Sequence, residues 1–151
     1  MLPSSVASTT LTSSLVSALE AYKQSAGIKL QVYPGRPRTI EPPHAWIDAR
    51  HDVVVSEVAG SAMEHTANVE LVVVHGMFDS AEAITQRDAW VDGFNSYLRD
   101  QLRSRGLAGG NSVLERWRVD DIPNYVPDWL PERERTTYYA TLYRLEVSIT
   151  D

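Results

Sequence analysis

A chain of 151 residues that is 43% hydrophobic and 23% charged is long enough to bury a core of its own and is expected to form one globular domain. Its net charge of −6 argues against a sequence-independent grip on DNA or RNA, which needs clustered Lys and Arg. The absence of cysteine excludes disulfides and thiolate chemistry, so any metal site would depend on His and carboxylates.

Neither a membrane anchor nor a secretion signal is expected. No segment approaches the roughly 20 consecutive apolar residues that a membrane helix requires. The first residues, "MLPSSVASTT", lack the basic start and the apolar stretch of a secretory signal. The sequence therefore predicts a protein that remains in the cytoplasm of the cell that makes it.

The N-terminal region is expected to be an arm followed by a helix. Residues 1–8 are rich in small polar residues and predict a flexible arm, which leaves 9–151 as the single domain. From Thr9 or Thr10 the pattern becomes helical, and Gly27 is expected to close the helix. The apolar residues that recur at spacings of three and four are Leu11, Leu15, Ala18, Leu19 and Tyr22.

A short strand and a proline-rich loop are expected next. Residues 28–33, "IKLQVY", alternate apolar and polar residues as a half-buried strand does. The segment 34–46, "PGRPRTIEPPHAW", contains four prolines and a glycine, and proline cannot donate to a sheet ladder. It is therefore expected to be a loop or an irregular edge, overlapping a short strand at 45–50, "AWIDAR".

The section 52–76 predicts one long antiparallel hairpin with a tip of small residues near 59–62. Its second arm has one apolar face, made of Ala67, Val69, Leu71 and Val73. Val72 and Val74 make the other face apolar as well, although Asn68 and Glu70 precede them on that side. A strand that is apolar on both faces is covered on both faces. A helix or a neighbouring subunit could supply that cover.

A second helix and two further strands complete the prediction. Asp79, three residues before Glu82, has the arrangement of a capping box that starts the helix. The helix is expected to end before Gly106 and the Gly109–Gly110 pair, and its predicted buried stripe is Ile84, Trp90, Val91, Phe94, Leu98 and Leu102. Strands are expected at 113–119 and 136–150, separated by a long loop over 120–135. The predicted class is α+β: a single antiparallel or mixed sheet of about four or five strands with two helices packed on it.

No group of residues predicts catalysis. His75 lies near Asp79 and Glu82, but negative charge at a helix N-terminus explains both acids without a catalytic role. The segments "AGSAM" and "GLAGGN" match neither a nucleophile elbow nor a phosphate loop. The chain is therefore predicted not to be an enzyme and to need no cofactor.

A metal site is not expected either. The histidines are His44, His51, His65 and His75, at gaps of seven, fourteen and ten residues, and there is no HExxH motif. Zinc sites usually include a close pair of ligands on a helix or a tight turn.

Aromatic residues in or beside the proline-rich loops leave two interpretations open. Trp46, Trp117, Tyr125 and Trp129 could bind a partner, because aromatic residues are enriched at the cores of interfaces and long loops in compact domains are often functional. Alternatively, the loops fold back and these side chains complete the core.

Several phrases of the sequence are similar to one family. They are "GIKLQVYPGRP", "PPHAWID", "VELVVVHGMFDSAEAITQRDAWVDGF" and the terminal "YYATLYRLEVSI", and together they run over most of the chain. In these phrases the chain resembles the tail terminator (tail completion) proteins of long-tailed bacteriophages, in particular those of phages of actinobacteria. The order of helix, strands, helix and strands agrees with the α+β fold of that family.

The resemblance implies a structural virion protein of the tail and neck, assembled in the host cytoplasm. Tail terminators form a ring, usually a hexamer, on the head-proximal end of the tail tube, where they stop tube polymerisation. The implied partners are copies of the same chain, the tail tube protein and a head-tail connector or stopper, whereas DNA only passes through the lumen. An acidic chain suits such a lumen because like charges repel.

In a ring, the subunit contacts must be heterologous, so one patch meets a different patch on the next copy. We expect the loop at 34–43, the hairpin tip at 59–63 and the loop at 125–129 to supply contacts to neighbouring subunits or to the tube. The residues assigned to these contacts are Pro34, Arg36, Pro37, Trp46, Met63, Tyr125 and Trp129.

Two alternatives stay open. Another ring protein of the phage neck, a head-tail connector or a stopper, would share the same bulk properties but bind the portal side. A small cytoplasmic ligand-binding or enzymatic domain would instead be a monomer with a ligand in its pocket.

Overall fold

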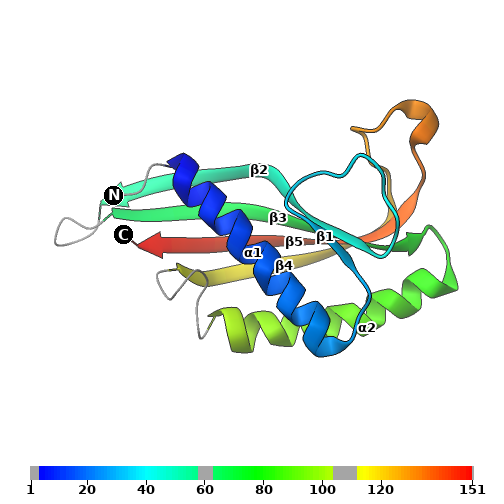
Figure 1. The fold of residues 1–151 in the computed structure, drawn as a ribbon, viewed down its shortest axis with the longest axis horizontal. Coiled ribbons are helices and arrows are strands. Elements are labelled where there is room, and N and C mark those ends of the chain that lie inside the picture. Colours follow the sequence, from blue (N-terminus) through cyan, green and yellow to red (C-terminus); the bar gives the residue numbers. More distant parts are fainter. Residues whose placement is uncertain (1–3, 58–62, 104–111, 151) are drawn as a thin grey trace.

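Within residues 4–57, 63–103 and 112–150, which this computed structural model describes, the chain forms one mixed sheet with two long helices (Figure 1). The strand order is β1-β2-β3-β5-β4, with β1 parallel to β2 and every other neighbouring pair antiparallel. The α+β prediction is confirmed. The elements are α1 Ser4–Ala26, β1 Gln31–Tyr33, β2 His44–Glu57, β3 Met63–Met77, α2 Ala81–Tyr97 with a π-helical extension Leu98–Arg103, β4 Ser112–Tyr125, a 3-10 turn Glu132–Glu134, and β5 Tyr138–Thr150.

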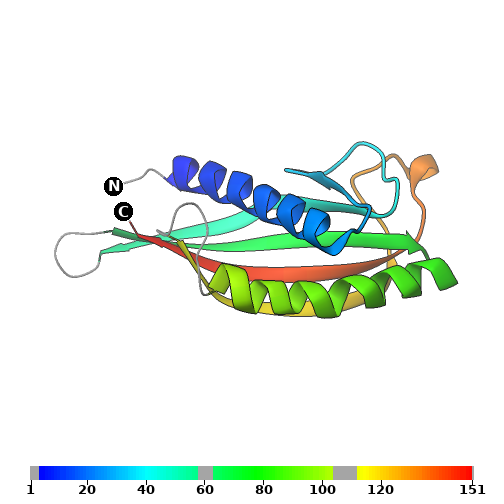
Figure 2. The same ribbon diagram turned by 60° about the horizontal axis from the view of Figure 1, so that its bottom comes forward.

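Both helices pack on the same face of the sheet. Tyr22 of α1 and Trp90 of α2 meet edge to face, with ring centroids 4.9 Å apart, and Phe94 of α2 meets Tyr143 of β5 at 5.0 Å. Figure 2 shows the two helices running along the sheet. We call this cluster the helix-side core, and its largest buried members are Leu19, Tyr22, Ile47, Leu71, Trp90, Phe94, Leu98, Leu114, Tyr143 and Leu145.

The first helix is longer than the sequence pattern predicts. It begins at Ser4 and not at Thr9 or Thr10, so residues 4–8, assigned to a flexible arm, are helical. Its end is as predicted, because Gly27 has a φ of +67°, a left-handed conformation that glycine adopts without a steric penalty. The strand after it is shorter than predicted, since only Gln31–Tyr33 pair with β2.

The second strand corrects the prediction of a separate short strand at 45–50. β2 is continuous from His44 to Glu57 and pairs with β3 over its whole length, with an irregularity between Asp48 and Asp52. The hairpin pairing predicted for 52–76 is confirmed, and the tip at 58–62 lies outside the described residues. The sequence pattern divided the strand because a bulge breaks the alternation of apolar residues.

The third strand is covered on both faces, as predicted. Val69, Leu71 and Val73 belong to the helix-side core, whereas Val72 and Val74 belong to a second cluster on the opposite face. No helix of the described residues covers this second face. The chain's own loops do so, and we call the cluster the loop-side core: Ile40, Trp46, Val72, Val74, Leu130, Tyr138 and Ala140.

The cap of α2 also differs from the prediction. Ser80, not Asp79, is the N-cap residue, and its hydroxyl accepts a hydrogen bond from the backbone N–H of Ala83 at 3.3 Å. Asp79 has a φ of 60° and belongs to the turn before the helix. Of the predicted buried stripe, Ile84 is instead 47% exposed, and Leu102 lies among side chains that the structure does not describe. The remaining members are buried: Trp90, Val91, Phe94 and Leu98.

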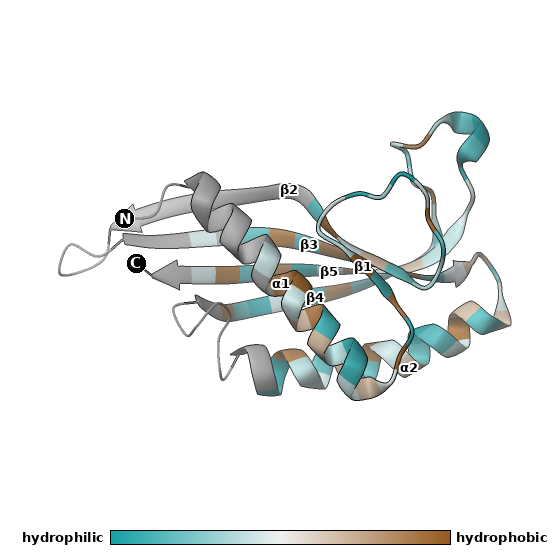
Figure 3. Cartoon of the chain, viewed as in Figure 1, coloured by the Kyte–Doolittle hydropathy of each residue, from teal (hydrophilic) through white to brown (hydrophobic). Residues whose placement is uncertain are grey.

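The last two strands, β4 and β5, complete the sheet on the other side of β3. β4 extends to Tyr125, so the predicted loop at 120–135 shortens to the segment 126–137. β5 is a strand as predicted, and Tyr143 and Leu145 belong to the helix-side core. Figure 3 shows hydrophobic residues along the strands beneath α1 and a hydrophilic 3-10 turn in the 126–137 segment.

Candidate interaction surfaces

The loop at 34–43 is held at two points, one on β2 and one on the 126–137 segment. The guanidinium of Arg36 donates to Asp48 Oδ2, with Nη2 at 3.1 Å and Nε at 3.3 Å, and Asp48 lies on β2 with its side chain 8% exposed. The indole Nε1 of Trp129 donates to the carbonyl oxygen of Pro37 at 2.9 Å. Arg36 also lies over the Trp129 ring, 4.8 Å from its centroid. The loop therefore has a defined position against the 126–137 segment.

The aromatic residues of these loops complete the core. Trp46 is 0% exposed and contacts Trp129 edge to face at 5.5 Å and Tyr125 at 6.2 Å between ring centroids. Burial raises the pKa of Tyr125 above its ordinary value. Of the two interpretations that the sequence left open, the structure shows the one in which the loops fold back.

The residues assigned to subunit contacts therefore differ in how much of their surface is exposed. Trp46 is 0% exposed and Pro37 is buried within the single chain, and their assignment to a subunit contact stays a prediction. The side chains that keep some exposed surface are Pro34, Arg36, Tyr125 and Trp129. Met63 lies at the opposite end of β3, paired with Glu57, and its side chain is outside the described residues.

His75 belongs to a polar network and not to a pocket with Asp79 and Glu82. Its Nδ1 contacts the side-chain amide of Gln86 on α2, and its Nε2 lies 2.7 Å from Oγ1 of Thr141 on β5. Thr141 donates in turn to Asp121 Oδ1 on β4 at 3.0 Å. Arg87 of α2 pairs with the same carboxylate, with Nη2 and Oδ2 2.7 Å apart. The network thus joins α2 to three strands of the sheet.

The donors of this network can be assigned. Because Thr141 gives its only hydroxyl proton to Asp121, its oxygen accepts from His75 Nε2–H. A neutral ring that is protonated at Nε2 offers Nδ1 as an acceptor. The Gln86 atom placed against Nδ1 is Oε1, whereas the Gln86 amide nitrogen is buried without a partner, so exchanging the two amide atoms gives Nδ1 an N–H donor and satisfies both groups. Burial, the largest cause, lowers the pKa of His75 from its ordinary 6.5 to about 4, so the ring is neutral near pH 7.

This arrangement supports a structural role for the histidine. His75 is 3% exposed and Thr141 is 0% exposed, so a substrate could not reach either side chain. The sequence pattern did not indicate Gln86, Thr141 or Asp121 as partners in a network with His75. One signal was available, because Thr141 is a polar residue on the apolar face of β5.

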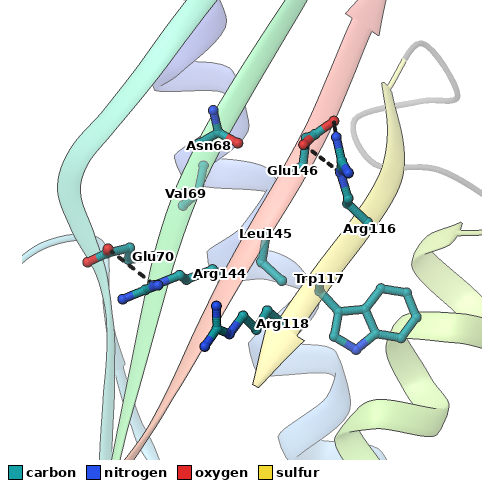
Figure 4. Close-up of a pocket in the computed structure, with 9 residues that line it drawn as sticks. All are labelled: Asn68, Val69, Glu70, Arg116, Trp117, Arg118, Arg144, Leu145 and Glu146. Carbon is teal, nitrogen blue, oxygen red and sulfur yellow. Dashed lines mark hydrogen bonds and ion pairs between the residues drawn. The ribbon is translucent and has the colours of Figure 1, made fainter. Parts of the chain in front are cut away.

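The other end of the loop-side face is open and charged. Arg116 pairs with Glu146 at 2.8 Å, and Arg144 approaches Glu70 at 3.9 Å, all from neighbouring strands (Figure 4). Together with Arg118 these side chains line a hollow of about 460 Å³. Since Arg118 pairs with Asp120 at 3.2 Å, acidic and basic groups balance here, as on a solvated sheet face.

Exposed apolar residues gather at one turn. Met77 at the end of β3 is 49% exposed, Phe78 in the connection 53%, and Ile84 in the first turn of α2 47%. Tyr33, at the start of the proline-rich loop, is 43% exposed. These residues, together with the exposed part of the loop at 34–39, are the candidate contact surfaces of the folded chain.

The described side chains contain no group of three or more His, Asp or Glu that could hold a metal ion. No helix in the described part of the chain is long and apolar enough to span a membrane. No protein-family model matches the chain, and no curated protein matches it in sequence.

Proposed function

We propose that this protein is a tail terminator: a structural virion protein whose copies form a ring, of six subunits, on the head-proximal end of a phage tail tube. The ring would end tube polymerisation and offer the surface on which the head joins the tail. Its partners would be the tail tube protein and a connector or stopper, and DNA would pass through the lumen without being bound.

The proposal rests mainly on the family resemblance of the segment 69–94. The phrase with the strongest family resemblance lies here, and it forms one continuous unit of strand, turn and helix at the centre of the fold. Three of the most exposed apolar side chains lie at or next to the turn of that unit: Met77 at the end of β3, Phe78 in the turn and Ile84 in the first turn of α2. A ring subunit needs such surfaces, because a monomeric protein rarely gathers exposed apolar residues without a partner.

Two further features support the proposal. The polar groups of greatest chemical interest, His75 and Thr141, are buried and serve the packing of α2 on the sheet. The net charge of −6 suits a channel that DNA must cross without sticking. An enzyme would need an accessible constellation of reactive groups.

Light scattering and electron microscopy test the proposal together. Purified protein is expected to form, alone or on the tube, a ring of six copies of the 16.9 kDa chain. Mixing it with the tail tube subunits of its phage should yield tubes with a cap at one end, whereas subunits without it should polymerise to uncontrolled lengths. A protein that leaves tubes uncapped but binds portal rings would be a connector or stopper. Binding to neither would overturn a role in the neck.

A further inference from the structure

The turn between β3 and α2 presents a fixed apolar surface. Phe78 is 53% exposed, and its backbone N–H donates to the carbonyl oxygen of Thr137 at 3.0 Å. Ser80 N–H donates to Met77 O at 3.2 Å, which closes the turn. The exposed aromatic side chain is therefore carried on an ordered backbone, and docking it costs little conformational entropy. We call Met77, Phe78, Asp79, Glu82 and Ile84 the turn surface.

The turn surface has an acidic rim. Asp79 and Glu82 are exposed, and neither forms an ion pair with another residue of the described ranges. Next to them, the outer side of α2 has a shallow hollow of about 460 Å³, which Glu82 shares with Ala81, Thr85, Gln86 and Ala89. An apolar side chain beside unpaired carboxylates selects a partner that is apolar and basic.

The proline-rich loop provides a surface with these properties. A hollow of about 410 Å³ is lined by residues 33–39, "YPGRPRT". Tyr33 and Pro34 give it an apolar side, and Arg36 and Arg38 give it positive charge. Arg36 is held by Asp48, whereas Arg38 is exposed and has no ion pair with any residue whose side chain is described. We call residues 33–39 the loop surface.

The loop surface is formed before any partner arrives. The Arg36–Asp48 ion pair of 3.1 Å and the bond from Trp129 Nε1 to Pro37 O of 2.9 Å hold its backbone in place. Ile40, immediately after it, is buried in the loop-side core. A hollow that is already shaped can receive a side chain without the cost of ordering a loop.

The two surfaces belong to opposite sides of the sheet. The turn surface adjoins α2, which packs in the helix-side core, whereas the loop surface adjoins Ile40 in the loop-side core. No hydrogen bond or ion pair recorded for the described residues joins them within one chain. Two different patches on opposite sides of one subunit can meet only between copies, and repeating that contact generates a ring or a filament.

We propose that the turn surface of one copy docks on the loop surface of the next, with Phe78 in the hollow of residues 33–39 and Arg38 facing Asp79 and Glu82. This contact rests on the proposed ring and identifies which parts of the subunit build it. Apolar surface meets apolar surface, and charges of opposite sign that lack a partner within the chain find one across the contact. The occupant of the turn surface is therefore a second copy of this chain.

Cysteine cross-linking tests the geometry directly, because the chain has no cysteine of its own. Phe78→Cys and Pro34→Cys proteins are purified separately, mixed and oxidised mildly. We expect a disulfide-linked dimer of twice 16.9 kDa that contains one chain of each kind. Arg116→Cys, on the open charged face with its side chain 79% exposed, is the matched control and should cross-link to Phe78→Cys only at background level.

A charge exchange tests the same contact without a covalent bond. Glu82→Lys and Arg38→Glu change exposed side chains, so both proteins should fold. Each single change should weaken association of the copies by roughly tenfold, because like charges then face each other. A chain that carries both changes should recover most of that loss, since the pair is restored with its signs exchanged.

Several outcomes would overturn the inference and leave the proposed function standing. Equal yields with Phe78→Cys and with the Arg116→Cys control would do so, as would rings that assemble normally with Glu82→Lys and with Arg38→Glu. Phe78→Cys that links only to itself would identify a contact between two turn surfaces, and Phe78→Cys that links only to tube subunits would identify another occupant. A chain that neither associates nor cross-links, yet caps tubes, would overturn the contact alone.

Discussion

Nε2 of His75 lies 2.7 Å from Oγ1 of Thr141, across the pairing of β3 with β5. Both side chains are almost fully buried, and the contact continues to Asp121 on β4 and to Gln86 on α2. The helix is therefore attached to the sheet by hydrogen bonds as well as by apolar packing. Since α2 begins at Ala81, three residues after Phe78, this network also holds the helix that follows the turn.

Acidification is expected to weaken the fold through His75. Burial lowers the pKa of this ring from 6.5 to about 4, so the unfolded chain takes up a proton that the folded chain still refuses. The stability conferred by the neutral ring is complete above pH 6.5 and is lost as the pH falls toward 4. The loss is worth roughly 3 kcal/mol once the pH is below both values.

Urea unfolding at pH 7.5 and pH 5 measures this effect. His75→Gln removes the titrating group, so between these pH values its free energy of unfolding should fall by about 2 kcal/mol less than that of the unchanged protein. The comparison cancels other titrating groups, including His44, whose pKa burial also lowers. Identical losses in the two proteins would contradict a neutral buried His75.

Thr141→Val should destabilise the protein without changing its shape. The substitution keeps the side-chain volume and removes the hydroxyl that accepts from His75 and donates to Asp121 at 3.0 Å. A buried donor left without a partner costs roughly 1–3 kcal/mol, which should appear in the free energy of unfolding. Thr85→Val is the control, because Thr85 is exposed on α2 and bonds only the Ala81 carbonyl, so a change of about 0.5 kcal/mol or less is expected.

Substitution of Trp129 is expected to lower the stability of the folded chain. Its indole packs on Trp46 and bonds Pro37 O, so it joins the two loops over the sheet. Trp129→Phe should cost about 1 kcal/mol for the lost hydrogen bond, and Trp129→Ala about 3 kcal/mol for the lost packing. Denaturant unfolding of the Trp129→Phe and Trp129→Ala proteins measures these losses of stability. Val126→Ala is the neutral control, because Val126 is 46% exposed. Equal stability of all three variants would return Trp129 to a purely intermolecular role.

The strands and helices were predictable where the signal is local. Val69, Leu71 and Val73 lie at every second position of β3. Such a period of two indicates that this face of the strand is buried, without indicating which element covers it. The same reasoning found that Val72 and Val74 needed a cover on the other face. What that cover is could not be read from the strand, because it depends on loops that are distant in sequence.

The loops and the polar network show the limit of the sequence. Tryptophans such as Trp46 and Trp129 are common both in interfaces and in cores, so the sequence does not decide between these two roles. The contact between their rings, with centroids 5.5 Å apart, shows that they pack within the chain. Asp79 and Ser80 are both good N-cap residues, and the choice falls to Ser80 because the turn puts Asp79 at a φ of 60°. His75 meets Gln86 on α2 and Thr141 on β5, which no spacing along the chain indicates.

The close approach of β3 to α2 gives a last prediction, at Gly76. A Cβ atom there would lie 2.9 Å from the Cβ and 3.2 Å from the Cα of Ala83, which is 0% exposed near the start of the helix. Gly76→Ala should therefore push α2 away from the sheet and cost roughly 1–3 kcal/mol in the free energy of unfolding. Gly35→Ala is the matched control, because a Cβ at Gly35 meets nothing within 4 Å. If both variants unfold at the same denaturant concentration, the helix is not packed as closely on β3 as the structure has it, and the position of the turn surface would have to be revised with it.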